Sequence, residues 1–343
     1  MKVKNAIKTL FPLTIIALFT LLFTSCEPQK EVVVYCTVDQ VFSEPILKDF
    51  EKETGIKVKA VYDTEETKST GVLNRLIAEK NNPQCDVFWS GDPLRNNILK
   101  ENGITTSYHS SATEQIPDYF REKDNHWIGF SARARVLIYN KKLISADSLP
   151  QGVLDFVLPK YKGRFAIANP LFGTTTFHIA AIYGLLGDSA SKSWLNGLKE
   201  NNVVIATSNG DVKKRVMNGQ LAFGLTDTDD AFEAKKESDD VDYIFLDQQE
   251  GGLGSLIIPN AVSAIAKSPN SAEAKLLIDY LLSKQTEAKL AISCAQMPLI
   301  KGVETPDDVP SLDQIKPMKV NYDHITTKLE AIQGWLKKWV EEN

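Results

Sequence analysis

Residues 127–140 read WIGFSARARVLIYN, an extended apolar pattern interrupted by Arg133 and Arg135. The run exceeds an ordinary strand of roughly five or six residues, so it can pass from one lobe of a protein to another. Side chains two apart on a strand face the same side, and both arginines can therefore point into one cleft. A guanidinium offers paired donors to an anion, and we favour Arg133 for that role. The alternative for either arginine is a surface salt bridge.

The chain before this run alternates strand and helix patterns. Apolar strands are predicted over residues 32–36, 56–62 and 86–89. Helices are predicted from Ser43 to Gly55, over residues 71–80, and from Asp92-Pro93 to near Gly103. This alternation is typical of a parallel sheet with right-handed helical crossovers.

A second set of strand and helix patterns follows the run. Strands are predicted at residues 165–168, 203–206 and 221–225, with helices that begin at Gly173 and after Ser208 and Asp230. Residues 256–266 then return to the first set, and helices follow at residues 271–282 and near the C-terminus. We predict an α/β fold in which lobe 2, residues 131–255, is inserted into lobe 1, residues 31–130 and 256–295. Residues 296–343 form a C-terminal helical segment.

The N-terminus has the pattern of an export signal. Three lysines precede an apolar run over residues 10–23, which is shorter than the roughly 20 residues that span a membrane. We predict a signal peptide over residues 1–25. Residues 23–26, FTSC, resemble a lipobox, so we expect a lipid on Cys26 that anchors the protein to a membrane, facing the periplasm or the cell exterior. The alternative is ordinary cleavage and free diffusion.

Charge and cysteine content narrow the function further. The formal net charge is −5 and no basic run offsets it, which argues against a nucleic-acid partner. Beyond Cys26, the chain holds Cys36, Cys85 and Cys294, an odd number that does not suit a disulfide framework. On parallel strands Cys36 and Cys85 would be offset by about four residues, too far to bridge. We predict three buried free thiols.

Motifs of enzymes are missing from the sequence. It contains no G-x-S-x-G, no G-x-G-x-x-G and no Walker loop, and its four histidines lack metal-ligand spacing. We therefore predict a protein that is not an enzyme and has no cofactor. Two alternatives remain: an exported enzyme with Asp229 as general base, and a sensor subunit that docks on a membrane kinase.

Polar or glycine residues stand repeatedly where a strand ends and a helix begins. In open α/β sheets ligands bind at that edge, where helix N-termini present free amides. The candidate ligand-binding residues are, besides Arg133, Asp39, Ser90, Asp92, Thr174, Thr175, Asn209, Asp227, Thr228 and Asp229. For residues 227–229 the alternative is helix capping, which needs only one of them.

Several segments together resemble a known family. Residues 50–58 (FEKETGIKV), 86–89 (DVFW) and 131–140 (SARARVLIYN) are similar to the ferric-ion-binding branch of the substrate-binding proteins of ABC importers. The similarity runs from about residue 31 to 295. It implies a monomeric protein of the type II periplasmic-binding fold, whose two lobes close on a ligand and then dock on a permease and ATPase complex.

The resemblance leaves two ligand classes open. It implies Asp39, Gly91 or Asp92, and Thr228-Asp229 at the ligand positions, the last in place of a tyrosine pair. Asp39 and Asp229 could hold ferric iron, or a ferric complex, as cargo through oxygen. They could equally neutralise the ammonium of an aminoalkylphosphonate, while Arg133 and residues 174–176 bind its phosphonate. A sugar is disfavoured, because only Trp89 and Trp127 offer aromatic stacking near the cleft.

Overall fold

The computed structural model describes residues 29–63 and 71–342. The fold described below is that of the compact unit Glu31–Asn343. The predicted signal peptide and Cys26 lie outside the described residues. Within the described parts of the chain, no helix is long and apolar enough to cross a membrane.

The first half of the sheet follows the predicted alternation. Strands β1 (Glu31–Cys36), β2 (Lys57–Tyr62) and β3 (Val87–Ser90) are parallel, and β10 (Ile257–Ile265) runs antiparallel beside β3. The helices between them are α2 (Gln40–Thr54), α3 (Gly71–Ala78) and α4 (Pro93–Glu101), and the short strand β4 (Thr105–Thr106) pairs with β10. A parallel sheet with helical crossovers is therefore confirmed for this part of the chain.

The start of α2 differs from the prediction. We expected the helix to begin at Ser43 with Pro45 in its first turn, but it begins at Gln40 and Pro45 lies inside it. The carbonyl of Asp39 already accepts hydrogen bonds from Phe42 and Ser43. Pro45 is the sixth residue of the helix, so its missing N–H costs one internal hydrogen bond, to the carbonyl of Val41. Gly55 ends the helix in the left-handed conformation, as predicted.

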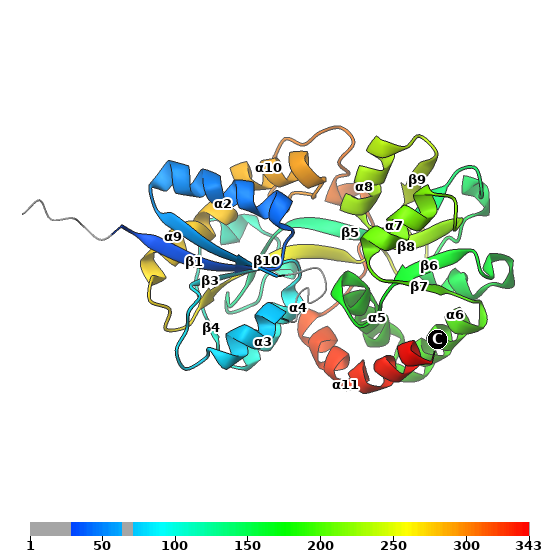
Figure 1. Ribbon diagram of the computed structural model, residues 1–343, viewed down its shortest axis with the longest axis horizontal. Coiled ribbons are helices and arrows are strands. Elements are labelled where there is room, and N and C mark those ends of the chain that lie inside the picture. The colour runs from blue at the N-terminus through cyan, green and yellow to red at the C-terminus, as the bar shows by residue number, and fades with distance from the viewer. Residues whose placement is uncertain (1–28, 64–70, 343) are drawn as a thin grey trace, which may run out of the picture. The chain divides into compact units, whose positions relative to one another are not determined.

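Strand β5 (Ile128–Asn140) is shared by the two halves of the sheet. Over residues 128–134 it pairs with β10, and from Arg135 onward it pairs with β8 (Phe223–Asp227) and β9 (Val241–Ile244). The sheet order is β2-β1-β3-β10-β5-β8-β6-β7. Figure 1 shows β5 and β10 running through the middle of this unit, from the helices around β1 to those around β8.

The second half of the sheet repeats the α/β pattern. Strands β6 (Phe165–Ala168), β7 (Val204–Ala206) and β8 are parallel. Their helices are α5 (Gly173–Leu186), α6 (Asp188–Glu200), α7 (Asn209–Met217) and α8 (Thr228–Glu237). Our sequence analysis did not predict α6, β4, β9 or the later helix α10 (Lys284–Cys294).

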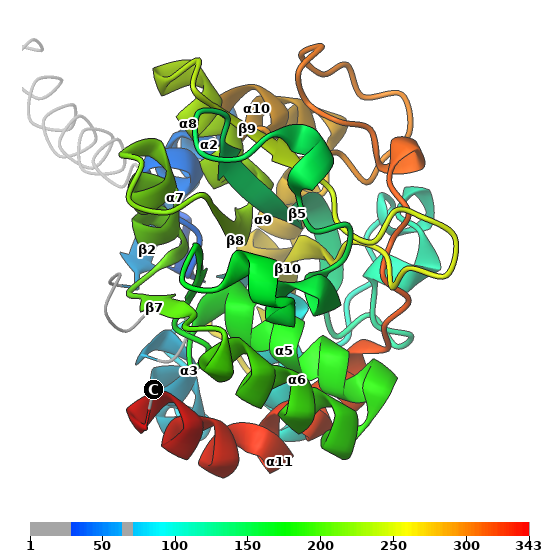
Figure 2. The same cartoon turned by 90° about the vertical axis from the view of Figure 1, so that its right-hand side faces the viewer.

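The C-terminal part adds helices to both halves. Helix α9 (Ser271–Leu281) packs on β10, and α11 (Tyr322–Glu341) packs against α5 and α4, as Figure 2 shows for α5. Tyr322 contacts the rings of Tyr119, Trp127 and Phe177. Short 3-10 helices occupy Thr113–Gln115, Asp118–Phe120, Ala146–Ser148, Val153–Val157, Pro159–Tyr161 and Leu312–Gln314.

The three cysteines behave as predicted. All are free and buried. Cys36 pairs with Trp89 across β1 and β3, so Cys85 lies four residues away along the strand. Burial raises the pKa of Cys36 and of Cys294 to about 12, which leaves both as unreactive thiols.

Candidate functional site

The predicted site residues gather around Arg133, where β5 passes between the two halves of the sheet. Burial lowers the pKa of the Arg133 guanidinium, but the carboxylates of Asp227, Asp229 and Asp92 outweigh burial and raise it. The charge of Asp39 in turn acts on Asp229. Four predicted carboxylates, two from each half, therefore lie within electrostatic reach of one another or of this arginine.

Asp227 is the centre of a hydrogen-bond network in the second half. One carboxylate oxygen accepts from Nη1 of Arg135 at 2.7 Å. The other accepts from Nε of Arg133 at 3.2 Å, from the Thr174 hydroxyl at 2.8 Å and from the Asn209 amide at 3.1 Å. Burial raises the pKa of Asp227, but the two arginines lower it below the ordinary value. Both oxygens are thus occupied by protein donors, and Asp227 positions other groups.

Arg135 is the more enclosed of the two arginines. Only 1% of its side chain is exposed. Its Nη1 and Nη2 donate to Asp227, Thr174, Asn209, Thr175 and the carbonyl of Leu225. The surface salt-bridge alternative is wrong for Arg135, because its guanidinium is buried and its Nη1 and Nη2 are bound by buried acceptors.

Arg133 keeps donors available. Its Nε is bound to Asp227, its side chain is 13% exposed, and within residues 29–63 and 71–342 its Nη1 and Nη2 have no hydrogen-bond partner. These two nitrogens lie beside Gly91 of the first half. A guanidinium held by Nε with both terminal nitrogens available is arranged for an anionic group.

Side chains from the starts of α5 and α7 hold Arg135 and Asp227 in place: Thr174, Thr175 and Asn209. The Thr174 hydroxyl donates to Asp227 and accepts from Arg135 and Asn209, while the Thr175 hydroxyl accepts from Arg135. Their side chains are therefore engaged with protein groups. Helix α5 begins at Gly173 without a side-chain cap, since the N-cap residue is Phe172. Its first backbone amides remain the donors that α5 can offer to a ligand.

Residues 228–230 form the first turn of α8. The Thr228 hydroxyl accepts from the Ala134 amide at 3.1 Å, which ties α8 to β5. Burial raises the pKa of Asp229 to about 6, with Asp227 and Asp39 adding to the rise. Burial also raises the pKa of Asp230 to about 7, and Asp229 and Asp227 add to it, although Lys213 lies 3.8 Å away. Our sequence analysis missed Asp230, whose only signal was its place directly after Asp229.

Capping does not account for Asp227. It stands at the N-cap of α8, yet its side chain makes no capping hydrogen bond because both oxygens face the arginines. The capping alternative for residues 227–229 is therefore wrong at its first residue. Among the described residues, the Asp229 carboxylate accepts a hydrogen bond only from the neighbouring Asp230 amide, at 3.1 Å.

Residues 90–92, where β3 ends and α4 begins, form the side of the site that belongs to the first half, which we call its wall. Asp92 caps α4 by accepting from the Leu94 amide at 2.9 Å and pairs with the buried Arg95. Ser90 accepts from the Asp92 amide. The Gly91 amide donates to the Thr37 hydroxyl. Asp92 and Ser90 are thus committed to the start of α4, while Asp39 is half-buried at the start of α2.

The two tryptophans do not line the site. Trp89 is fully buried against Phe130, and Trp127 is 2% exposed against Tyr322. The sequence analysis counted both as the aromatic side chains that could stack on a sugar, and their burial shows that neither ring is available for stacking. Strand alternation turns Trp89 into the core of the first half.

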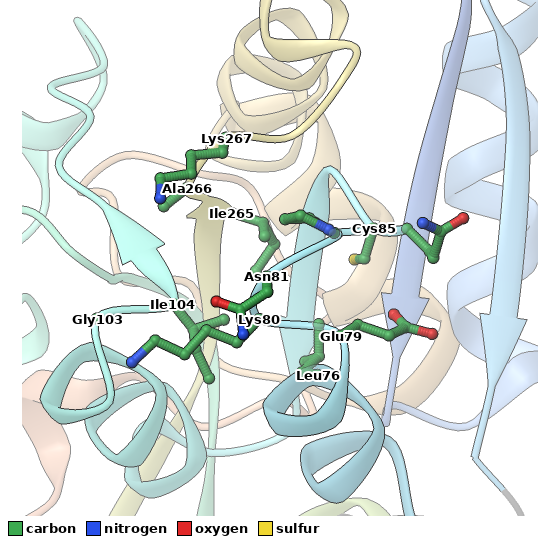
Figure 3. Close-up of a pocket in the computed structure, with 12 residues that line it drawn as sticks. Leu76, Glu79, Lys80, Asn81, Cys85, Gly103, Ile104, Ile265, Ala266 and Lys267 are labelled. Carbon is green, nitrogen blue, oxygen red and sulfur yellow. The ribbon is translucent and has the colours of Figure 1, made fainter.

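Two hollows in the surface lie away from the site around Arg133. A cavity of about 50 Å³ between α3, the start of β3 and the end of β10 is lined by residues that include Glu79, Cys85 and Lys267 (Figure 3). A groove of about 510 Å³ lies between α2 and β2. Neither contains a predicted site residue. Among the described residues, no group of three or more His, Cys, Asp or Glu side chains could hold a metal ion. The tentative pair Asp39 and Asp229 stays a prediction.

The sequence of residues 46–317 matches the family model described as bacterial extracellular solute-binding protein. The chain belongs to this family. Iron uptake protein A1 of Synechocystis sp. is 26% identical over 324 residues, covering 90% of this chain and 88% of the relative. The putative 2-aminoethylphosphonate-binding periplasmic protein of Salmonella typhi is 25% identical over 292 residues, covering 84% of this chain and 80% of the relative.

Solved structures confirm the fold of this solute-binding protein. Apo ferric ion-binding protein A of Pasteurella haemolytica has a TM-score of 0.81 at 25% identity, covering 92% of this chain and 99% of that chain. Iron-bound HitA of Pseudomonas aeruginosa also has a TM-score of 0.81, at 22% identity, covering 90% and 99%. The predicted two-lobed α/β fold of the periplasmic-binding type is therefore correct, and the protein serves solute transport.

Proposed function

We propose that this protein captures a compact solute that carries both an anionic and a cationic group, of which an aminoalkylphosphonate is the model compound. One observation carries the proposal: among the described residues, the two terminal nitrogens of Arg133 have no hydrogen-bond partner, and the carboxylate of Asp229 acts electrostatically on the same guanidinium. The guanidinium would bind the phosphonate, and Asp229 and Asp39 would neutralise the ammonium. The charges of such a ligand match those of the site.

Capture proceeds by closure of the two lobes in this proposal. Lobe 2 comprises residues 131–255, and the ligand stabilises the closed state by touching both lobes. The closed form then docks on the permease and ATPase of an ABC importer. A lipid on Cys26 holds the protein at the membrane, facing the periplasm or the cell exterior. The relation to extracellular solute-binding proteins supports this arrangement.

Ferric iron, or a ferric complex, is the second candidate. It is supported by the electrostatic effect of Asp39 on Asp229, two carboxylates from different halves of the sheet. Several relatives are ferric iron-binding proteins by name. In this arrangement iron is cargo, the carboxylates supply oxygen ligands, and Arg133 binds an accompanying anion.

Calorimetry on the mature protein separates the candidates. We would titrate 2-aminoethylphosphonate, ethylphosphonate, ethanolamine and ferric citrate into protein stripped of ligand. The proposal predicts that the zwitterion binds more tightly than either half-molecule by at least about tenfold, or about 1.4 kcal/mol. Binding of ferric citrate alone would establish the iron candidate instead.

The two remaining alternatives are tested on the same material. Phosphorus NMR of the bound phosphonate should show no product after prolonged incubation, and turnover would favour an exported enzyme with Asp229 as base. Native mass spectrometry of protein from its own exported compartment should reveal the bound mass of the natural solute. Co-purification with a membrane kinase in place of a permease would favour the sensor role.

A further inference from the structure

Gly91 follows β3 directly and meets the guanidinium of Arg133 across the site. A Cβ atom on Gly91 would lie 3.3 Å from Nη2 of Arg133, 3.9 Å from Nη1 and 3.9 Å from a methyl group of Val38. The first of these distances is tighter than ordinary van der Waals contact. Even the smallest side chain here would therefore press on Nη2, one of the two terminal nitrogens that we assign to the ligand.

The arginine cannot simply turn aside. Its Nε is bound to Asp227 at 3.2 Å, and Asp227 is itself held by Arg135, Thr174 and Asn209. To relieve the contact from position 91, Nη2 of Arg133 would have to move by a few tenths of an ångström while Nε stays bound to Asp227. The backbone of Gly91 does not by itself require glycine, because its φ lies outside the left-handed region. The need for glycine at this position comes from the space that Arg133 occupies.

We infer that Gly91 is a specificity-determining position that sets the charge of the ligand. The missing side chain lets the Arg133 guanidinium stand against the wall of the first half, with two donors open to an anion. A carboxylate at position 91 would reach the same nitrogens and pair with them. The site would then hold its carboxylates without an available guanidinium, and would select cations. This inference rests on the proposed function, and it identifies Gly91 as the residue that determines the charge of the ligand.

The test compares Gly91→Ala and Gly91→Glu with a matched control, Gly334→Ala. Gly334 lies in α11, where an added Cβ would meet nothing within 4 Å. Titration of 2-aminoethylphosphonate and ethylphosphonate should give about tenfold weaker binding for Gly91→Ala, and about hundredfold or more for Gly91→Glu, with no change for Gly334→Ala. Ethanolamine should bind Gly91→Glu more tightly than it binds the unaltered protein. Thermal unfolding of each variant checks that the fold is intact.

A second readout is independent of the ligand. The Nε–H resonance of Arg133, assigned by its loss in Arg133→Lys, should shift in Gly91→Ala and stay in place in Gly334→Ala. An unchanged resonance in Gly91→Ala overturns the inference, as does full phosphonate affinity in Gly91→Glu. If the unaltered protein binds no phosphonate, the proposed function fails, and the resonance alone then decides the role of Gly91.

Discussion

The two walls of the site satisfy their polar groups in different ways. In the second half, Asp227, Arg135, Thr174 and Asn209 bond to one another and leave few side-chain donors over. In the first half, Asp92 and Ser90 serve the start of α4, and Gly91 offers only backbone. Arg133 lies between the two walls: its Nε is bound to Asp227 of the second half, and its terminal nitrogens face Gly91 of the first half. A rigid wall that holds one exposed guanidinium loses little entropy when an anion binds.

The largest effect is expected from removing the centre of the rigid wall. Asp227→Ala leaves the buried Arg135 without its carboxylate, and breaking a buried ion pair in this way costs about 3–5 kcal/mol. We expect a lower free energy of unfolding in denaturant titrations, and no detectable phosphonate binding. Lys142→Ala, which breaks the exposed pair with Asp240, is the control and should cost less than about 1 kcal/mol. Equal effects of the two variants would show that the Asp227 network is not a rigid unit.

Arg133→Gln separates binding from folding. A hydrogen bond to a charged group contributes about 1.5–3 kcal/mol, so phosphonate affinity should fall by roughly 10- to 150-fold. Stability should change far less than in Asp227→Ala, because within the described part of the chain Arg133 makes one protein hydrogen bond, whereas Arg135 makes several. Calorimetry and thermal unfolding on the same sample measure both quantities. Retained affinity would move the anion site away from Arg133.

Asp229→Ala tests the cationic side of the site. We expect affinity for 2-aminoethylphosphonate to fall by about tenfold or more, since an ion pair in a partly buried site is lost. Affinity for ethylphosphonate, which has no ammonium, should stay the same or rise. If the zwitterion still binds within about twofold of its original affinity, Asp229 serves only the first turn of α8.

The pH dependence of stability gives the smallest expected effect. Burial raises the pKa of Asp229 to about 6 and of Asp230 to about 7, above the ordinary value of about 3.9 for an unfolded chain. The folded protein therefore holds more protons, and these two groups destabilise it as pH rises from about 4 to about 7. Asp230→Asn should raise the melting temperature at pH 8 and have little effect at pH 4.5. A variant that gains nothing at pH 8 would contradict the raised pKa.

Local pattern was enough to predict the elements around the site. Alternating apolar runs marked β1, β3 and β6, and Asp92-Pro93 marked the start of α4, because strand alternation and helix capping depend on neighbours in sequence. Helices α6 and α10 were missed. Only Gly187 separates α6 from α5, and only Leu282 and Ser283 separate α10 from α9, so each pair of helices follows almost without a break in the sequence.

The sequence alone predicted Asp227 and Asp229 at the edge where parallel strands end, and Arg133 on the strand that crosses to the same cleft. It favoured Arg133 over Arg135 for the anion, although both face the same side of β5 and no local pattern separates them. Only the tertiary structure decided that Arg135 is enclosed by Thr174, Thr175 and Asn209, while Arg133 reaches Gly91. These contacts join segments more than thirty residues apart. Burial and hydrogen-bond saturation are properties of such long-range contacts, and no local pattern encodes them.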